Sequence, residues 1–172
     1  MEAMIRQAQA EDLQDILDIY NDAIVNTTAV YDYAPRTLEK QREWYEQKVQ
    51  AGWPVLVFDD GGIAGFATYG PFRARPAYKY TVEHSVYVHK DWRHRGIAKA
   101  LLEVLIRVAD EAGYKTLIAG IDSENLASIR LHESLGFTLC GTLRNVGFKF
   151  GRWLDLQFYQ LNLQGPENPT EG

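Results

Sequence analysis

The stretch from Val86 to Ala98, Val-Tyr-Val-His-Lys-Asp-Trp-Arg-His-Arg-Gly-Ile-Ala, decides the fold. Apolar and polar side chains alternate over residues 80–88, which lead into this stretch and overlap its first three residues. Such alternation is typical of a strand. From its end, over 96–112, apolar side chains recur at helical spacing, and Gly113 suits the end of a helix. The stretch therefore predicts a strand that runs through a basic loop directly into a helix.

This loop has the chemistry of an anion site. The first turn of a helix offers N–H groups without partners in the helix, together with the positive end of the helix dipole. Gly96 and Ala98 leave the backbone open to close approach, and Arg93, His94 and Arg95 add positive charge. The pattern favours a bound pyrophosphate, although a solvated helix start without a ligand has the same local sequence.

Periodicity and turn residues predict the elements around this unit. Strands are predicted at 5–8, 55–58, 63–69, 80–88, 116–121, 137–143 and 154–161. Helices are predicted at 11–25, 38–51, 96–112 and 125–135. The order of these elements is that of a mixed α/β fold, with a single domain over 1–163 and a loose polar tail over 164–172.

The composition argues against several classes of protein. With 18 basic and 23 acidic residues, the formal net charge of -5 does not suit a broad nucleic-acid surface. No basic leader precedes an apolar core, and no apolar run approaches a membrane span. The single cysteine, Cys140, excludes a disulfide framework and lies in an apolar stretch, so we expect a buried thiol that is not a nucleophile. We expect a cytoplasmic protein without nucleic-acid or membrane partners.

A second polar feature lies on the helix predicted at 125–135. Asn125, Ser128 and His132 stand at positions i, i+3 and i+7, so they form a polar stripe along one side of the helix. An apolar stripe on another side lets the same helix pack on a sheet. The polar stripe either contacts a ligand or faces solvent.

Three short segments agree in order with a known family. They are Arg-x-x-Gly-x-Ala at 93–98 after Val-Tyr-Val, Asp-Ser-Glu-Asn-Leu-Ala-Ser at 122–128, and Leu-Gly-Phe at 135–137. Together they resemble the signatures of the GNAT superfamily of acetyltransferases. The resemblance implies acetyl-CoA as co-substrate, no metal, and a mostly antiparallel sheet that is splayed at the cofactor site. It assigns the cofactor contacts to Val86, Tyr87, Val88, Arg93, His94, Arg95, Gly96, Ile97, Ala98, Asn125 and Ser128.

Acetyl transfer from a thioester needs a base for the amine, donors for the developing oxyanion and stabilisation of the leaving thiolate. Glu83, three residues before Val86, is the candidate general base, directly or through water; an ordinary strand-surface carboxylate is the alternative. The resemblance implies that the backbone amide near Val86 donates a hydrogen bond to the developing oxyanion. Many relatives carry a tyrosine, proposed to protonate the thiolate, where this chain has His132. His132 is therefore an acid, a base or a structural residue.

A closer resemblance covers residues 4–163. It rests on Ile-Tyr-Asn at 19–21, Asn-Thr-Thr-Ala at 26–29, Thr-Val-Glu-His-Ser-Val-Tyr-Val at 81–88 and Gly-Phe-Lys-Phe-Gly-Arg-Trp-Leu-Asp at 147–155. These segments resemble GNAT enzymes that acetylate phosphinothricin, methionine sulfoximine and methionine sulfone. The resemblance implies an amino-acid-like acceptor, Glu83 and His132 as catalytic residues, and a homodimer.

Such acceptors carry an α-carboxylate and a tetrahedral phosphorus or sulfur centre, which suit guanidinium donors and an aromatic wall. We therefore expect acceptor contacts from Phe72, Arg73, Arg75, Tyr78, Glu83, His84, Ser85 and Lys149. Solvated loop charges are the alternative for Arg73 and Arg75. A dimer interface is the alternative for Lys149, together with Arg152 and Trp153.

Three functions fit the sequence. They are acetylation of a small amino-acid analogue, acylation of another amine such as a polyamine or a peptide N-terminus, and acyl-CoA binding by a non-catalytic regulator. A polyamine site should be acidic, whereas the loop before the strand contributes Arg73 and Arg75. A regulator has no need of a base, whereas Glu83 is retained. Direct attack of an amino-acid amine on the thioester is the leading hypothesis.

Overall fold

The computed structural model describes residues 2–172. The strands are β1 (Met4–Gln7), β2 (Val55–Asp59), β3 (Ile63–Pro71), β4 (Thr81–Val88), β5 (Thr116–Asp122), β6 (Thr138–Lys149) and β7 (Arg152–Asn162). The helices are α1 (Leu13–Asn26), α2 (Leu38–Ala51), α3 (Ile97–Glu111) and α4 (Leu126–Ser134), with short 3-10 turns η1 (Ala10–Asp12), η2 (Pro76–Tyr78) and η3 (Lys90–Trp92). Among the described residues, no helix has the length and apolar character needed to cross a membrane.

The seven strands form one sheet in the order β1-β2-β3-β4-β5-β7-β6. The β4–β5 pair is parallel, whereas β1–β2, β2–β3, β5–β7 and β6–β7 are antiparallel. The predicted mixed α/β class, with four helices and a mostly antiparallel sheet, is therefore confirmed. The chain divides into two compact units, the first running to Tyr69 and including Ser85–Leu105, the second comprising Gly70–His84 and Ile106–Gly172.

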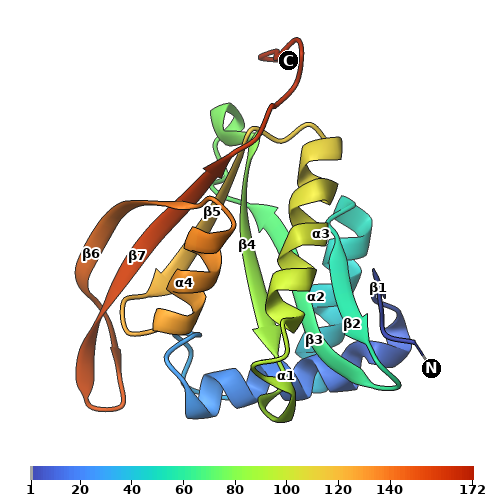
Figure 1. The fold of residues 1–172 in the computed structure, drawn as a ribbon, viewed down its shortest axis with the longest axis vertical. Coiled ribbons are helices and arrows are strands. Elements are labelled where there is room, and N and C mark those ends of the chain that lie inside the picture. The colour runs from blue at the N-terminus through green and yellow to red at the C-terminus, as the bar shows by residue number, and fades with distance from the viewer. Residues whose placement is uncertain (1) are drawn as a thin grey trace. The chain divides into compact units, whose positions relative to one another are not determined.

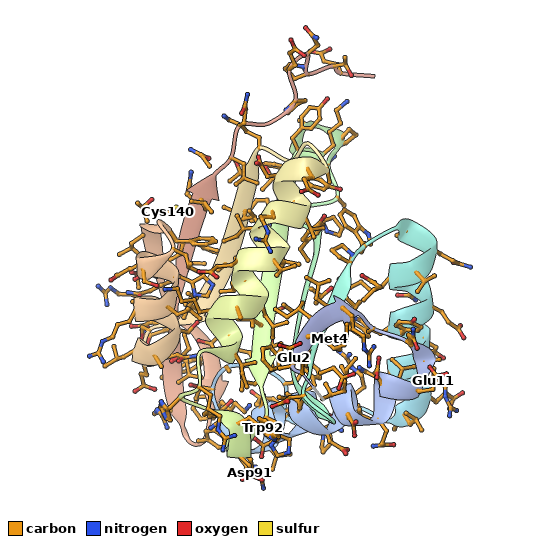
Figure 2. All side chains as sticks on the ribbon, turned by 45° about the vertical axis from the view of Figure 1, so that its right-hand side comes forward. Glu2, Met4, Glu11, Asp91, Trp92 and Cys140 are labelled. Atoms are coloured by element: carbon orange, nitrogen blue, oxygen red, sulfur yellow. The ribbon has the colours of Figure 1, made fainter. Side chains whose placement is uncertain are left out.

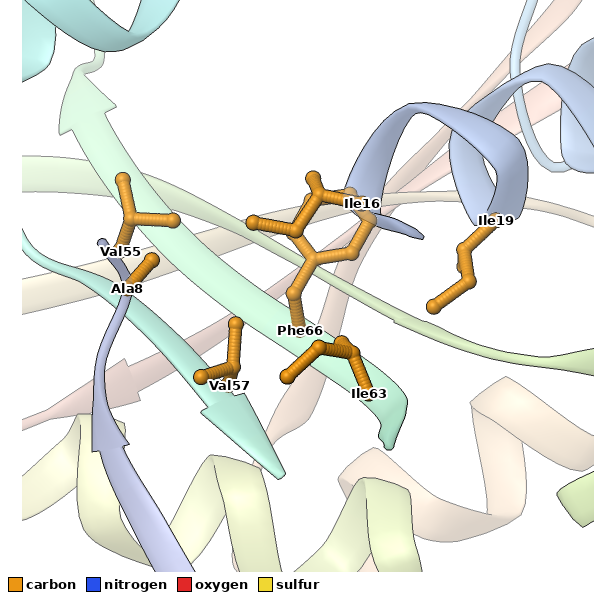
Figure 3. Close-up of a cluster of buried hydrophobic side chains, with 7 residues drawn as sticks. All are labelled: Ala8, Ile16, Ile19, Val55, Val57, Ile63 and Phe66. Atoms are coloured by element: carbon orange, nitrogen blue, oxygen red, sulfur yellow. The ribbon is translucent and has the colours of Figure 1, made fainter. Parts of the chain in front are cut away.

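The core of the first unit forms where α1 meets the strands. Apolar residues recur on α1 at helical spacing, so one side of the helix is buried. Figure 3 shows Ile16 and Ile19 of α1 turned toward Phe66 on β3. The other members of this buried cluster are Ala8, Val55, Val57 and Ile63. Burial of these side chains fixes α1 against β2 and β3.

Helix α2 begins and ends where the sequence predicts. The Thr37 side chain accepts a hydrogen bond from the Lys40 amide at 3.2 Å, which satisfies one of the free amides of the first turn. Gly52 ends the helix in the left-handed conformation, with φ of 75°. A polar residue, Gln41, lies on the buried side of this helix and is 1% exposed.

In the second unit, β6 and β7 form a long hairpin beside β5 (Figure 1). Both strands extend beyond the predicted ranges, because register shifts after Leu139 and Leu143 interrupt the alternation that marks a strand in sequence. The expectation of a buried Cys140 is wrong. Cys140 lies on β6, the last strand in the sheet order, where its side chain is exposed (Figure 2).

Candidate active site

The loop between β4 and α3 has the backbone shape of an anion site. His94 and Gly96 both adopt left-handed conformations, with φ of 64° and 76°. The Gly96 carbonyl accepts a hydrogen bond from the Ala100 amide at 3.1 Å, so the first turn of α3 starts directly after the glycine. A Cβ at Gly96 would meet no described heavy atom within 4 Å. The backbone there is open to a ligand, and the amides of the first turn are available to it.

The loop presents its cations to solvent. Arg93, His94 and Arg95 are all exposed. Arg93 forms an ion pair with Asp22 at 3.6 Å, while the Arg95 guanidinium lies 4.9 Å from the centre of the Trp92 ring. Figure 2 shows Trp92 beside Asp91 in this loop. Asp22 offsets part of the charge of Arg93, and the exposed surface of the loop stays basic.

Gly65 on β3 lets the start of α3 pack closely in the first unit. A Cβ at this position would lie 2.9 Å from the Tyr87 carbonyl oxygen and 3.2 Å from side-chain atoms of both Ile97 and Leu101. The His89 amide donates to the Ala64 carbonyl at 2.8 Å, which anchors the beginning of the loop. Any side chain at position 65 would displace the strand or the helix that shapes the loop.

In the second unit, Glu83 stands at the end of the parallel ladder that pairs Thr81–Glu83 of β4 with β5. Its carboxylate is half-buried. Burial raises the pKa of Glu83, and the positive charge of Arg73 acts in the opposite direction. Its Oε2 lies 3.6 Å from the position that a Cβ at Gly120 would occupy, so the carboxylate lies over Gly120 at van der Waals distance. A carboxylate with a raised pKa is suited to accept a proton near neutral pH.

Two histidines form a buried pair in the second unit. His84 of β4 and His132 of α4 are 5% and 2% exposed. Their Nε2 atoms are 2.9 Å apart, and the rings stack with centres separated by 5.2 Å. The Phe137 ring packs against both imidazoles. Among residues 2–172, no group of three or more His, Cys, Asp or Glu side chains is arranged to hold a metal ion.

The hydrogen bonds of this pair fix its protons. The Ser128 carbonyl can only accept, so His132 Nδ1, at 2.7 Å, carries the hydrogen of that bond. Burial lowers the pKa of both histidines, that of His84 to about 3 with a further contribution from His132, so both rings are neutral at pH 7. His132 Nε2 then accepts from the Nε2–H group of His84. The remaining nitrogen, His84 Nδ1, is a buried acceptor without a hydrogen-bond partner among the described residues.

The two predicted catalytic residues lie on opposite faces of the sheet. Glu83 and His84 are neighbours on β4, and successive side chains of a strand point to opposite sides. His84 contacts His132 of α4, whereas Glu83 lies over Gly120 of β5. The structure therefore joins His132 to His84 and not to Glu83.

The polar stripe predicted on α4 is partly used within the helix itself. The Asn125 side-chain oxygen accepts from the Ser128 amide at 3.2 Å and caps the helix. The Ser128 hydroxyl lies 3.3 Å from His132 Nδ1. Asn125 and Ser128 are half-buried, and His132 is buried. The stripe therefore organises the helix start and orients the His132 ring.

The predicted acceptor residues before β4 are partly brought together. The Phe72 and Tyr78 rings meet edge to face at 5.6 Å, and the Arg73 guanidinium lies 4.3 Å from the centre of the Phe72 ring. Arg73 also acts electrostatically on Glu83. Arg75 is exposed. Phe72, Arg73, Tyr78 and Glu83 therefore form the best-connected part of the predicted acceptor site.

Lys149 has a different setting from these loop residues. It is 4% exposed on β6, and its ammonium lies 5.1 Å from the centre of the Phe150 ring. Arg152 and Trp153, which were predicted together with Lys149, are both exposed. Arg152 forms an ion pair with Glu124 at 2.6 Å, and Trp153 is 65% exposed. Lys149 and Arg152 are cross-strand partners at the end of the β6–β7 ladder, so the three residues are neighbours that differ in burial.

Sequence reasoning missed a cavity in the first unit. It has a volume of about 80 Å³ and is lined by Tyr20, Arg36, Gln41, Trp44, Phe66, Thr68, Ser85 and Tyr87. One signal was visible in the sequence. Gln41 lies three residues before Trp44 on the same side of the predicted helix, and a polar residue on a packed side calls for a polar partner. Arg36 supplies that partner, because it donates to the Gln41 side-chain oxygen at 2.9 Å.

Comparison with known proteins agrees with this geometry. The model of the GNAT acetyltransferase domain matches residues 5–157. An L-methionine sulfoximine/L-methionine sulfone acetyltransferase of Pseudomonas paraeruginosa is 47% identical over 95% of this chain and 96% of its own length.

Two crystal structures are similar to this fold. An N-acetyltransferase from Staphylococcus aureus has a TM-score of 0.94 and 54% identity, covering 95% of this chain and 100% of its own. A phosphinothricin acetyltransferase from Sinorhizobium meliloti, in complex with acetyl-CoA, has a TM-score of 0.94 and 38% identity, covering 100% of this chain and 95% of its own. The chain therefore belongs to the GNAT acetyltransferase family and is an acetyl-CoA-dependent N-acetyltransferase.

Proposed function

We propose that this enzyme acetylates the α-amino group of a small amino-acid analogue of the methionine sulfoximine, methionine sulfone or phosphinothricin type. The main support for this class of acceptor is the similarity to an enzyme that is named for two of these acceptors. The two sequences are 47% identical along nearly the whole chain. The arginine-bearing loop before β4 supports it, because an anionic amino acid suits guanidinium donors better than a polyamine does.

The loop between β4 and α3 is the proposed site for the cofactor's pyrophosphate. The open backbone at Gly96 and the first-turn amides at Ile97 and Ala98 fit a phosphate group, and the exposed cations of 93–95 add attraction. The backbone of 86–88 is the proposed partner of the pantetheine arm, with Asn125 and Ser128 as further contacts. Acetyl-CoA, when bound, supplies the acetyl group as a thioester.

Glu83 is the proposed general base. As the α-amino group is acylated it must lose a proton, and Glu83 accepts that proton directly or through one water. Burial supports this role because it raises the carboxylate's affinity for protons. The Val86 amide is the proposed donor to the negative charge that develops on the carbonyl oxygen. The Arg73 cation acts against the effect of burial on the Glu83 pKa and so favours the ionised carboxylate.

His132 is proposed to act through His84. Both ring nitrogens of His132 are engaged, Nδ1 by the Ser128 carbonyl and Nε2 by His84. The open nitrogen of the pair is His84 Nδ1. In this arrangement His132 holds the buried His84 ring in one orientation and one tautomer, so His132 is proposed as a positioning residue on the face of β4 opposite to Glu83.

The test of the proposed function is acetyl-CoA-dependent thiol release. Methionine sulfone, methionine sulfoximine and phosphinothricin are compared with a polyamine and with a peptide that has a free N-terminus. Release with the three amino-acid analogues and not with the other two amines is expected. Release only with the polyamine or the peptide would refute the acceptor class and leave the enzyme class intact.

The assembly and location are proposed as a homodimer in the cytoplasm. The β6–β7 hairpin exposes six large apolar side chains, which are Leu139, Leu143, Val146, Phe148, Phe150 and Trp153. Exposed apolar side chains on an edge strand are typical of a protein–protein interface, and the proposed partner is a second copy of this chain. The single cysteine and the acidic net charge support a reducing compartment without nucleic-acid partners. Light scattering of the purified protein tests the dimer, and a monomeric mass refutes it.

A further inference from the structure

Arg36 is held in one orientation at the cavity of the first unit. Its guanidinium carbon lies 4.4 Å from the centre of the Tyr20 ring and 5.9 Å from that of Trp44. Its side chain donates to the buried Gln41 amide oxygen at 2.9 Å. Asn21 fixes its main chain, accepting from the Arg36 amide at 2.8 Å and donating to the Arg36 carbonyl at 2.9 Å. The side chain and the backbone of Arg36 are therefore both held in place before any ligand binds.

The charge of Arg36 forms no ion pair with a carboxylate among residues 2–172. None of the ion pairs formed within residues 2–172 includes Arg36. Asp32 influences the nearby phenols of Tyr20 and Tyr87, and it makes no ion pair with the guanidinium. A half-buried guanidinium with five donors, one of them bonded to Gln41, is incompletely satisfied. An anion with paired oxygens would complete it.

The cavity has the size and lining for such a group. Its volume of about 80 Å³ suits one small functional group and not a whole amino acid. Aromatic rings form its apolar walls, while Thr68 and Ser85 contribute hydroxyl groups. Ser85 is the second residue after Glu83 on β4, so strand alternation turns both side chains to the same face.

We propose that Arg36 binds the α-carboxylate of the acceptor. This inference rests on the proposed function, because the α-carboxylate is the one group that all the proposed acceptors share. The planar guanidinium matches a carboxylate through two parallel N–H···O bonds, whereas a sulfone is neutral and leaves the cation uncompensated. Arg36 thus selects amino acids over simple amines, and Gln41 and Asn21 position it.

The test compares methionine sulfone with its primary amide, which keeps the amine and the sulfone and lacks the carboxylate. In the native enzyme the acid should have the lower KM. Arg36→Gln should raise the KM for the acid by roughly 10- to 100-fold, the range expected for loss of a charge-assisted pair, while the KM for the amide hardly changes. Arg36→Lys keeps the charge and should fall in between. Arg42→Gln, which removes an exposed arginine of α2 that does not line the cavity, is the matched control and should leave both values unchanged.

Two further measurements separate the possible failures. Acetyl-CoA affinity and thermal unfolding of each variant show whether the fold and the cofactor site are intact. Calorimetric binding of the acid and the amide to the native enzyme with CoA tests the cavity without catalysis. Equal affinity for acid and amide, or an equal rise in both KM values for Arg36→Gln, overturns the inference. If no acceptor is acetylated but the acid binds and Arg36→Gln abolishes its binding, the inference stands and the proposed acceptors fail.

Discussion

Replacement of Glu83 by Gln removes the proposed proton acceptor with little change in shape. The amide is nearly isosteric with the carboxylate and fits the same space beside Gly120. Because a positioned base contributes about 10²- to 10⁴-fold to proton-transfer steps, kcat with methionine sulfone should fall by that factor. This corresponds to a rise of about 3–5 kcal/mol in the activation barrier. Acetyl-CoA affinity should be preserved, since the proposed cofactor contacts do not include Glu83.

The pH profile distinguishes a base from a merely structural carboxylate. In the native enzyme, kcat/KM should rise with pH as Glu83 loses its proton, and burial places that rise above the pH at which an ordinary glutamate ionises. In Glu83→Gln this acidic limb should disappear, leaving only the ionisation of the acceptor amine. The assay is thiol release across pH 5–9, with acetyl-CoA binding as the control. An unchanged kcat, or an acidic limb that persists in the variant, would falsify the assignment of Glu83 as the base.

Three further predictions follow from contacts in the structure. Gly120→Val adds methyl groups beyond a Cβ that would already touch the Glu83 carboxylate at 3.6 Å, so the carboxylate should be displaced and kcat should drop by about 10²-fold with acetyl-CoA affinity retained. A native kcat would contradict this packing. Asp12→Asn breaks a partly buried ion pair with Arg6 and should lower the free energy of urea unfolding by about 1–2 kcal/mol at pH 7. Because the folded pKa of Asp12 is lowered, the native contribution is present above about pH 4 and is lost as the pH falls through the folded pKa. Nitrogen NMR at pH 7.5 should show neutral rings with hydrogen on Nδ1 of His132 and Nε2 of His84, and an imidazolium or the reverse tautomers would disprove the proton assignment.

The sequence allowed the element order to be predicted because most signals are local. Apolar periodicity located the helices to within one or two residues, and Gly52 and Gly113 adopt the left-handed conformations expected after helices. The β6–β7 hairpin was underestimated for a physical reason. Asn145, with φ of 56°, lies where the register shifts, and a bulge breaks the alternation by which a strand is recognised. The same hairpin exposes apolar side chains, so apolar character did not imply burial for Cys140.

The candidate site was predictable only where its residues are contiguous. The basic loop and Glu83 belong to one stretch of chain, and their chemistry can be inferred from order alone. The His84–His132 pair joins residues that are 48 positions apart. The cavity at Arg36 depends on side chains from two helices, two strands and a loop. No local pattern encodes such distances, so these features emerge only from tertiary packing.

Burial in the second unit shifts Glu83, His84 and His132 in the direction of neutrality. It raises the pKa of Glu83 and lowers those of His84 and His132, since each charged form is poorly solvated. The same desolvation would act on the ammonium of a bound acceptor, and the nearby Arg73 cation would oppose that charge further. Desolvation and Arg73 therefore favour loss of the ammonium proton, which the ionised Glu83 carboxylate is positioned to accept, and the neutral amine is the only form with a lone pair for attack. The base then has to remove a proton only as the new bond forms, so moderate basicity in Glu83 is sufficient.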